Sequence, residues 1–354
     1  MQHEKLYNEA VGLLTAMIAT PSASGEESIT GDLVWQFLRN NKIRNIERKH
    51  NNVWARNLHF DPSRPTILLN SHHDTVRPNV AYTRDPYDPD VEGDKLYGLG
   101  SNDAGASVVA LLAAFAHFYS RAEMKYNIII AMSGEEEING PNGLESIIPE
   151  LGLIDFAIVG EPTGMQMAIA ERGLIVLDCI ASGRAGHAAR EEGENAIYKA
   201  MRDIEWVGTY KFPMESELFG AVKMTVTVIE AGTQHNVVPA ECRFTIDVRS
   251  IEKYTNEEIV EIIRKNLQSE VKPRSTRLKP SSISIDHPIV QAGKKMGLTT
   301  FGSPTTSDQA VLNCPSLKMG VGDSARSHSA DEYVLFSEIR EGIRTYINLL
   351  ELIL

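Results

Sequence analysis

The stretch "TILLNSHHDTV", residues 66–76, runs from apolar side chains directly into two histidines and an aspartate. Its first half suits a buried β-strand, which has no structural use for His72 and Asp74 at its end. Ligands collect at strand ends in open α/β sheets, and a metal-binding imidazole usually donates its second N–H to a carboxylate. His72 and Asp74 therefore fit a metal ligand with its orienting acid. Taken alone, they fit a surface histidine and a turn-capping aspartate equally well.

The sequence around this stretch alternates between helix-like and strand-like segments. Helical spacing of apolar residues covers 6–17, 30–40 and 105–120, and strand-like segments cover 52–58, 65–71, 126–133 and 156–161. Several of these strands are apolar throughout, which indicates a sheet covered on both faces. The pattern predicts an α/β layer architecture.

From residue 171 the pattern changes to that of a second, smaller domain. Strands are expected at 171–183, 221–232, 240–250 and around 274–279, with helices at 195–206 and 256–267, the latter capped by Thr255 or Asn256. This β-α-β-β-α-β order is that of a ferredoxin-like sandwich. Two further helices, at 287–298 and 338–354, follow it. We therefore predict an α+β domain over residues 171–281, inserted into a larger mixed-sheet α/β domain formed by 1–170 and 282–354.

Composition excludes several classes of protein. The 354 residues are 42% hydrophobic, and the net charge of −12 argues against a duplex nucleic acid partner. Cys179, Cys242 and Cys314 are scattered, which argues against a disulfide framework and a thiolate zinc site and favours a reducing cytoplasm. Glu4 and Glu9 precede the first apolar segment, so it fits an amphipathic helix better than a signal peptide. No apolar run is long enough to span a membrane.

Four further segments deliver carboxylates or a histidine into loops. "KLYGLGSNDAGAS" (95–107) presents Asp103 in a tight turn and lacks the Lys-Ser/Thr of a phosphate loop. "IIIAMSGEEEINGPNG" (128–143) ends a buried strand in three glutamates, whose mutual repulsion favours a bound cation. "FAIVGEP" (156–162) supplies Glu161, and "GVGDSARSHSADEY" (320–333) supplies His328.

Taken together, these segments predict a two-metal site. Nitrogen and oxygen ligands without sulfur suit zinc, with cobalt or manganese as alternatives. One carboxylate bridging two ions, with a histidine and a glutamate for each ion, makes a pair about 3.5–4 Å apart that activates water for hydrolysis. A spare glutamate beside a ligand glutamate is then a natural general base.

In their order and context, these motifs resemble those of the co-catalytic zinc deacylases and exopeptidases, which include acetylornithine deacetylase, succinyl-diaminopimelate desuccinylase and aminoacylase. The resemblance covers nearly the whole chain. It implies two divalent ions per chain, held by His72, Asp103, Glu137, Glu161 and His328. Asp103 would bridge the ions, Asp74 would steer His72, and Glu136 would be the general base. It also implies a cis peptide bond after Asp103.

Two positions depart from the family pattern. Glu135 stands where the family usually has an aspartate, so a register one residue earlier along the glutamate triplet stays open. Gly105 stands where a lysine is frequent, which affects the subfamily and not the metal ligands.

The inserted domain also resembles the lid and dimerisation domain of the family. His187 would help to polarise the scissile carbonyl, and in dimeric members this histidine comes from the partner subunit. Candidate substrate-binding residues are Asn236, Arg249, Arg172, Gly302, Ser303 and Asp308. Arg249 at a strand end could hold an α-carboxylate bidentately. Without the family context, a helix N-terminal histidine is the preferred interpretation of His187. An exposed strand arginine explains Arg249 as well, and Ser303 and Asp308 are equally common in plain loops.

These features predict a cytoplasmic homodimeric hydrolase that removes the N-acyl group from a small-molecule N-acyl amino acid. Acetylornithine-type deacetylation in arginine biosynthesis, acting on N-acetyl- or N-succinyl-ornithine or citrulline, is the leading hypothesis. A succinyl-diaminopimelate desuccinylase, and a dipeptidase or aminopeptidase using the same site, are the close alternatives. A non-catalytic metal- or peptide-binding module is the alternative from another class.

Overall fold

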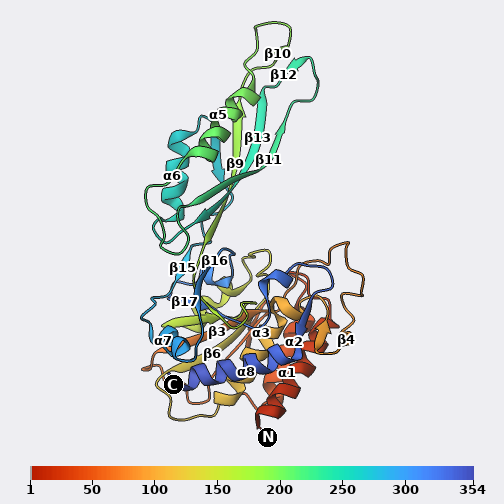
Figure 1. The fold of residues 1–354 in the computed structure, drawn as a ribbon, viewed down its shortest axis with the longest axis vertical. Helices are drawn as coiled ribbons and strands as arrows, with labels where there is room; N and C mark the ends of the chain where they lie inside the picture. Colours follow the sequence, from red (N-terminus) through yellow and green to blue (C-terminus); the bar gives the residue numbers. More distant parts are fainter. Residues whose placement is uncertain (1) are drawn as a thin grey trace. The chain divides into compact units, whose positions relative to one another are not determined.

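The computed structural model describes residues 2–354 and divides the chain into two compact units. The first contains the described residues up to Ala170, together with Ser282–Phe301 and Ser307–Leu354. The second contains Glu171–Ser281 and the short segment Gly302–Thr306. Figure 1 shows the elements of each unit. The expected boundaries of 171–281 match the main part of the second unit. They did not include the segment Gly302–Thr306, which the structure also assigns to it.

A mixed sheet forms the centre of the first unit. Among the described residues it has nine strands in the order β1-β2-β6-β3-β7-β17-β8-β15, with β16 paired to β8. Their bounds are β1 Glu47–Lys49, β2 Asn52–Arg56, β3 Thr66–His72, β6 Asn127–Ser133, β7 Phe156–Val159, β8 Met167–Glu171, β15 Ser281–Ser282, β16 Thr300–Ser303 and β17 Ser316–Lys318. β3 runs parallel to β6 and β7, whereas β2 runs antiparallel to β6. The predicted α/β class with a mixed sheet is confirmed.

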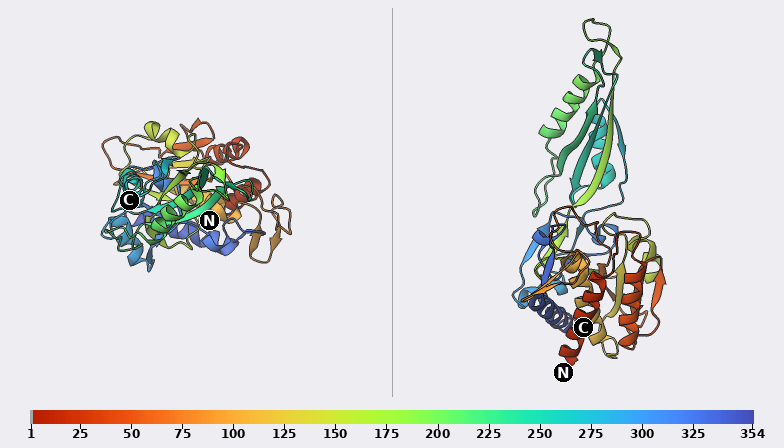
Figure 2. Two further views of the ribbon diagram at one scale, coloured as in Figure 1. Left: turned by 90° about the horizontal axis from the view of Figure 1, so that it is seen from above. Right: turned by 90° about the vertical axis from the view of Figure 1, so that its right-hand side faces the viewer.

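Helices cover the two faces of this sheet unequally. They are α1 Gln2–Ile18, α2 Ser28–Asn40, α3 Ala106–Phe118, α4 Ile148–Leu151, α7 Pro288–Lys295 and α8 Phe336–Glu351. Short 3₁₀ turns at Leu144–Ile147, Asp308–Val311 and Ser324–Arg326, and an irregular turn at Ser101–Gly105, complete the unit. α1 contacts both α3 and α8, and Figure 2 shows the red α1 beside the dark blue α8.

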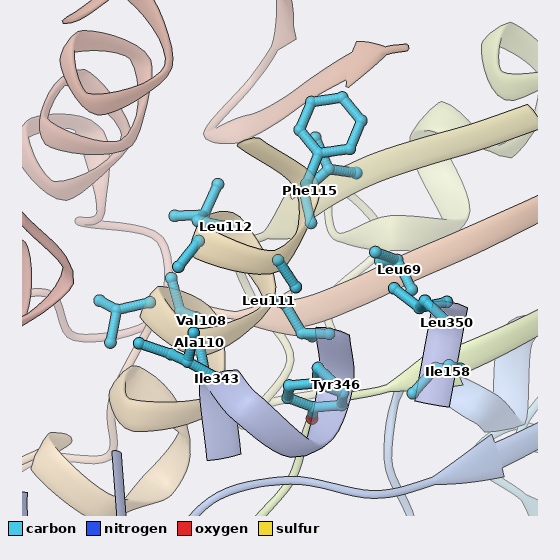
Figure 3. Packing of buried hydrophobic residues seen from close by; sticks show 14 of the residues in the cluster. Leu69, Val108, Ala110, Leu111, Leu112, Phe115, Ile158, Ile343, Tyr346 and Leu350 are labelled. Atoms are coloured by element: carbon cyan, nitrogen blue, oxygen red, sulfur yellow. The ribbon is translucent and has the colours of Figure 1, made fainter. Parts of the chain in front are cut away.

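Two hydrophobic cores flank the central sheet. Side chains alternate between the faces of a strand, so Ile67 and Leu69 join the core under α1, α3 and α8, while Leu68 joins a smaller core with Leu144 and Leu151. Figure 3 shows side chains of α3 and α8 packed against those of β3 and β7. Burial on both faces explains why the central strands are apolar throughout.

The second unit is an antiparallel sandwich with a core of its own. Its main elements are β9 Gly173–Ser182, α5 Ala196–Thr209, β11 Lys223–Ala231, β13 Glu241–Ser250, α6 Asn256–Asn266 and β14 Glu270–Pro273. The sheet order β11-β13-β9-β14 is the ferredoxin-like arrangement that was predicted. The strand expected around 274–279 is wrong: β14 lies earlier, because Glu270–Pro273 are the residues that pair with β9, and the backbone N–H of Arg274 adds one further hydrogen bond, to Val176.

Among the described residues, two small sheets complete the units, and one of them contributes Leu96 and Val334 to the larger core. β10 (Gly186–His187) pairs with β12 (Val237–Val238) in the second unit. In the first unit, β18 (Tyr333–Leu335) pairs with β5 (Lys95–Tyr97), which pairs with β4 (Val91–Glu92). Among the described residues, no helix combines the length and the apolar character needed to cross a bilayer.

Candidate metal centre

The buried imidazole of His72 lies among carboxylates contributed by three separate segments. Its Nε2 is 3.3 Å from Asp103 Oδ1, 3.7 Å from Glu161 Oε1 and 3.9 Å from Glu136 Oε2. His72 is the last residue of β3, and Glu161 follows the parallel neighbour β7, so the sheet itself brings these two side chains to one edge. The polar end of this strand is therefore explained by its surroundings: His72 faces a cluster of acids.

Asp103 lies between two histidines. Its Oδ1 faces His72, and its Oδ2 is 3.6 Å from Nε2 of His328. Two oxygens directed at two different imidazoles are the geometry that a bridging carboxylate requires. The peptide bond between Asp103 and Ala104 is cis, which confirms the expectation drawn from the resemblance.

The three consecutive glutamates have different surroundings. The carboxylate of Glu135 accepts hydrogen bonds from the backbone and side-chain N–H groups of Asn142, within its own loop. Glu137 lies 3.0 Å from His328 Nε2, and Glu136 lies on the side of His72. The structure therefore brings Glu136 and Glu137 into the cluster and directs Glu135 away from it.

Asp74 contacts more than His72. Its carboxylate accepts the backbone N–H groups of Glu136 and Glu137, both at 3.1 Å, and the hydroxyl of Ser24 at 2.7 Å. Nδ1 of His72 lies 3.0 Å from the backbone oxygen of Asp74 and 3.5 Å from its carboxylate. Asp74 thus orients the glutamate turn as well as the imidazole.

The electrostatics of the cluster favour bound cations. Burial raises the pKa of Glu161 to about 8, and burial together with Glu161 and Asp308 raises the pKa of Glu136 well above its usual range. Burial alone would lower the pKa of His72, but Glu136 and Glu161 outweigh it and raise that pKa well above its ordinary value. The hydrogen bond with Glu137 raises the pKa of His328 to about 9.

So many buried acids remain ionised at neutral pH only if positive charge offsets them. Potential ligand atoms of His72, Asp103 and Glu137 lie within 4.8 Å of one another, and so do those of His72, Glu161 and the neighbouring Glu136. Imidazole nitrogens and carboxylate oxygens without sulfur are donors that suit zinc and related divalent ions. The residues present therefore fit a pair of such ions.

Two buried glutamates that support this cluster were missed at the sequence level. Glu27 accepts the backbone N–H groups of Gly25 and Glu135 and the side-chain amide of Asn51. Glu332 accepts backbone N–H groups from the segment that carries Asp103. Both occur in polar, turn-like sequence, where a charged residue is usually solvated. Only the folded chain places them inside.

The candidates for substrate binding lie mostly in the second unit. Arg249 forms two hydrogen bonds with Asp247, and Arg172 donates to the backbone oxygens of Phe219, Ala221 and Arg249. The guanidinium of Arg172 therefore has a structural role that its sequence context did not indicate.

The other candidates divide into two groups. His187 and Asn236 are both exposed and lie together on the β10–β12 ribbon, where Ala188 N–H donates to the Asn236 oxygen. Gly302 packs so closely on Phe219 that a Cβ would lie 2.6 Å from its ring. Ser303 is buried, and its backbone oxygen accepts the backbone N–H of Arg172.

Asp308 lies in the first unit, beside the carboxylate cluster. It is buried, and its Oδ2 accepts a hydrogen bond from the Ser133 hydroxyl at 2.5 Å. Burial raises the pKa of Asp308 to about 6. Asp308 thus belongs to the first unit, whereas Gly302 and Ser303 are assigned to the second.

Comparisons with known proteins give matches in sequence and in fold. The sequence profile of Peptidase family M20/M25/M40 matches residues 68–352. A succinyl-diaminopimelate desuccinylase from Corynebacterium glutamicum is 27% identical over 356 residues, covering 95% of this chain and 94% of that protein.

Solved structures show the same fold. An M20 metallo-carboxypeptidase from Sulfolobus solfataricus superposes with a TM-score of 0.77 at 17% identity, over 97% of this chain and 99% of that one. A dinuclear metal-binding M20 peptidase from Bacillus subtilis gives 0.74 at 16% identity, over 99% and 98%. Because the family profile spans most of the sequence, the chain belongs to Peptidase family M20/M25/M40 and is a metal-dependent hydrolase of the metallopeptidase type.

Proposed function

We propose that the chain hydrolyses the amide bond of N-acyl amino acids with two divalent ions, zinc in the first place and cobalt or manganese as alternatives. The observation that carries the proposal is the position of Asp103. One of its oxygens faces His72, on the side of Glu161, and the other faces His328, on the side of Glu137. Each half of the cluster thus offers a histidine, a glutamate and a share of one carboxylate.

Bound ions of this kind polarise a carbonyl group and lower the pKa of water. The carboxylate of Glu136 lies 3.9 Å from His72 Nε2, beyond hydrogen-bond distance. Glu136 is therefore the residue of the cluster that we assign as the general base. It takes a proton from the attacking water and delivers it to the leaving nitrogen, so that the amide C–N bond breaks into a carboxylic acid and a free amine. Burial raises the pKa of Glu136, which makes its carboxylate a stronger proton acceptor than an exposed glutamate.

For the substrate we propose an acetylornithine-type compound first, that is, N-acetyl- or N-succinyl-ornithine or citrulline. Arg249 would hold the α-carboxylate with the N–H groups that Asp247 and Thr306 leave free, and His187 and Asn236 would contact the scissile amide. N-succinyl-diaminopimelate is the second candidate, because the Corynebacterium relative carries that name. Dipeptides are the third, because the solved structures are named as peptidases.

A panel of substrates tests the proposal. Metal-loaded enzyme is incubated with N-acetylornithine, N-acetylcitrulline, N-succinylornithine, N-succinyl-diaminopimelate and several dipeptides, and the released amine is quantified. We expect the acyl ornithines or citrullines to give the highest kcat/KM, and the His72→Ala variant to be inactive on all of them. Turnover of dipeptides alone would refute the deacylase proposal and leave the family assignment intact.

A further inference from the structure

Glu332 is a buried carboxylate whose oxygens accept hydrogen bonds from backbone N–H groups. The residue is 2% exposed. One oxygen accepts the backbone N–H groups of Asn102 and Asp103, both at 2.8 Å, and the other accepts that of Gly100 at 3.1 Å. Three amides of the turn that carries Asp103 are thus held by a single side chain.

Glu332 also belongs to the segment that carries the opposite ligand. It follows His328 by four residues, and its own backbone oxygen accepts the N–H of Gly98 at 2.9 Å. The next residue, Tyr333, pairs with Tyr97 in the β18–β5 ladder. The two segments that deliver Asp103 and His328 are therefore joined side by side at Glu332.

Joining these segments does not by itself require the Glu332 carboxylate. The β18–β5 ladder already connects them, and Asn102 and Asp323 exchange two further hydrogen bonds, at 2.9 and 3.1 Å. A second carboxylate beside Asp103 brings like charges together, which is unfavourable. What the carboxylate adds is specific: it fixes the two successive peptide planes that precede Asp103, and hence the direction of that side chain.

We propose that Glu332 is a positioning residue that aims the two oxygens of Asp103 at the two halves of the metal pair. This inference rests on the two-metal function proposed above. Residues behind metal ligands that orient them typically change metal affinity by about 10- to 100-fold when they are replaced. Glu332 acts through the backbone N–H of a ligand, as Asp74 does for Glu137.

The adjacent residue offers a matched control. Asp331 also accepts three hydrogen bonds, from Thr83 N, Thr83 Oγ1 and Arg84 N, but they tie down an outer loop and reach no candidate ligand. Glu332→Gln and Asp331→Asn are the same acid-to-amide change at neighbouring positions. In Glu332→Gln the new amide would place an NH₂ group against an N–H of the Asp103 turn. Asparagine tolerates the left-handed backbone that Asp331 adopts, with φ 53°.

The experiment titrates metal-free wild type and both variants with Zn²⁺ by calorimetry and with Co²⁺ by visible absorption, and records the melting temperature of each metal-free protein. We expect two equivalents in wild type and Asp331→Asn. In Glu332→Gln we expect at least one equivalent of metal to bind about 10-fold more weakly than in wild type, or weaker still. We also expect an altered Co²⁺ spectrum. The decrease in kcat should be larger than any change in KM. Glu332→Asp, which keeps the charge but loses reach, should show the same defect.

The outcomes separate the two proposals. If wild type binds fewer than two equivalents, the two-metal function fails. If wild type binds two and Glu332→Gln and Glu332→Asp bind both as tightly as Asp331→Asn, the positioning role is wrong, even if their metal-free melting temperatures fall. If Glu332→Gln does not fold, Glu332→Asp decides by the same comparison.

Discussion

At the scale of residues, the glutamate triplet shows how identical side chains acquire different tasks. The backbone N–H of Glu135 is held by Glu27, and those of Glu136 and Glu137 are held by Asp74. Glu135 adopts a left-handed backbone conformation, with φ 56°, and this turn separates its side chain from the next two. The acids that fix the turn come from distant parts of the chain, so sequence alone left the register of the triplet open.

This arrangement predicts different effects of amide substitutions along the triplet. Glu136→Gln should keep both metal equivalents and lower kcat by about 10²–10⁴-fold, because an amide cannot accept the proton. Glu135→Gln is the control, and it should keep most of the activity because its side chain bonds Asn142. Steady-state kinetics and metal analysis of the two variants check this. An active Glu136→Gln beside an inactive Glu135→Gln would move the base by one residue.

At the scale of elements, long strands and helices were predictable and short strands were not. β3 and β6 are recognisable in the sequence because both contain a run of apolar residues. That run reflects the burial of all seven residues in each strand. β17 has three residues, and its place between β7 and β8 depends on partners more than a hundred residues earlier in the chain. A local pattern contains no information about such pairing. The same reason explains why Glu27 and Glu332 were missed, whereas His72 and Asp103 follow recognisable motifs.

Helix α6 offers a test at this scale. Thr255 forms a capping box with Glu258: its hydroxyl accepts the Glu258 N–H, and the Glu258 carboxylate accepts the Thr255 N–H. Thr255→Ala should destabilise the second unit by about 1 kcal/mol and speed hydrogen exchange in α6, without changing metal affinity. Thr209→Ala, at an exposed site at the end of α5, is the control and should have little effect. Equal exchange rates in α6 of wild type and Thr255→Ala would contradict the assignment.

At the scale of the whole molecule, the candidate residues are divided between two units. The predicted metal ligands belong to the first unit, and His187 and Asn236 belong to the second. β11 is an edge strand of the four-stranded sheet in the second unit, and its residues Val228 and Ile229 are exposed. This edge therefore suits pairing with the same strand of a second copy of the chain. We propose a two-fold dimer through the second units, in which His187 of each chain serves the metal site of its partner.

Mixing two inactive variants tests this assembly. Glu136→Gln and His187→Ala are combined under conditions that exchange subunits, and a heterodimer should regain one of its two active sites. Each variant alone, taken through the same exchange, is the control. Size measurements should show dimers throughout. If exchange is demonstrated and no activity returns, His187 does not act across the dimer.

The discontinuous first unit has a consequence for the chain during its synthesis. His72, Asp103, Glu137 and Glu161 leave the ribosome before any residue of the second unit, and His328 leaves it well after. The second unit, with a core of its own, can fold while the first sheet still lacks β17 between β7 and β8. An ion bound at that stage would meet an incomplete set of the proposed ligands. Occupancy of the proposed metal pair would therefore report that translation has passed residue 328, which lies beyond the strand β17 of the interrupted sheet.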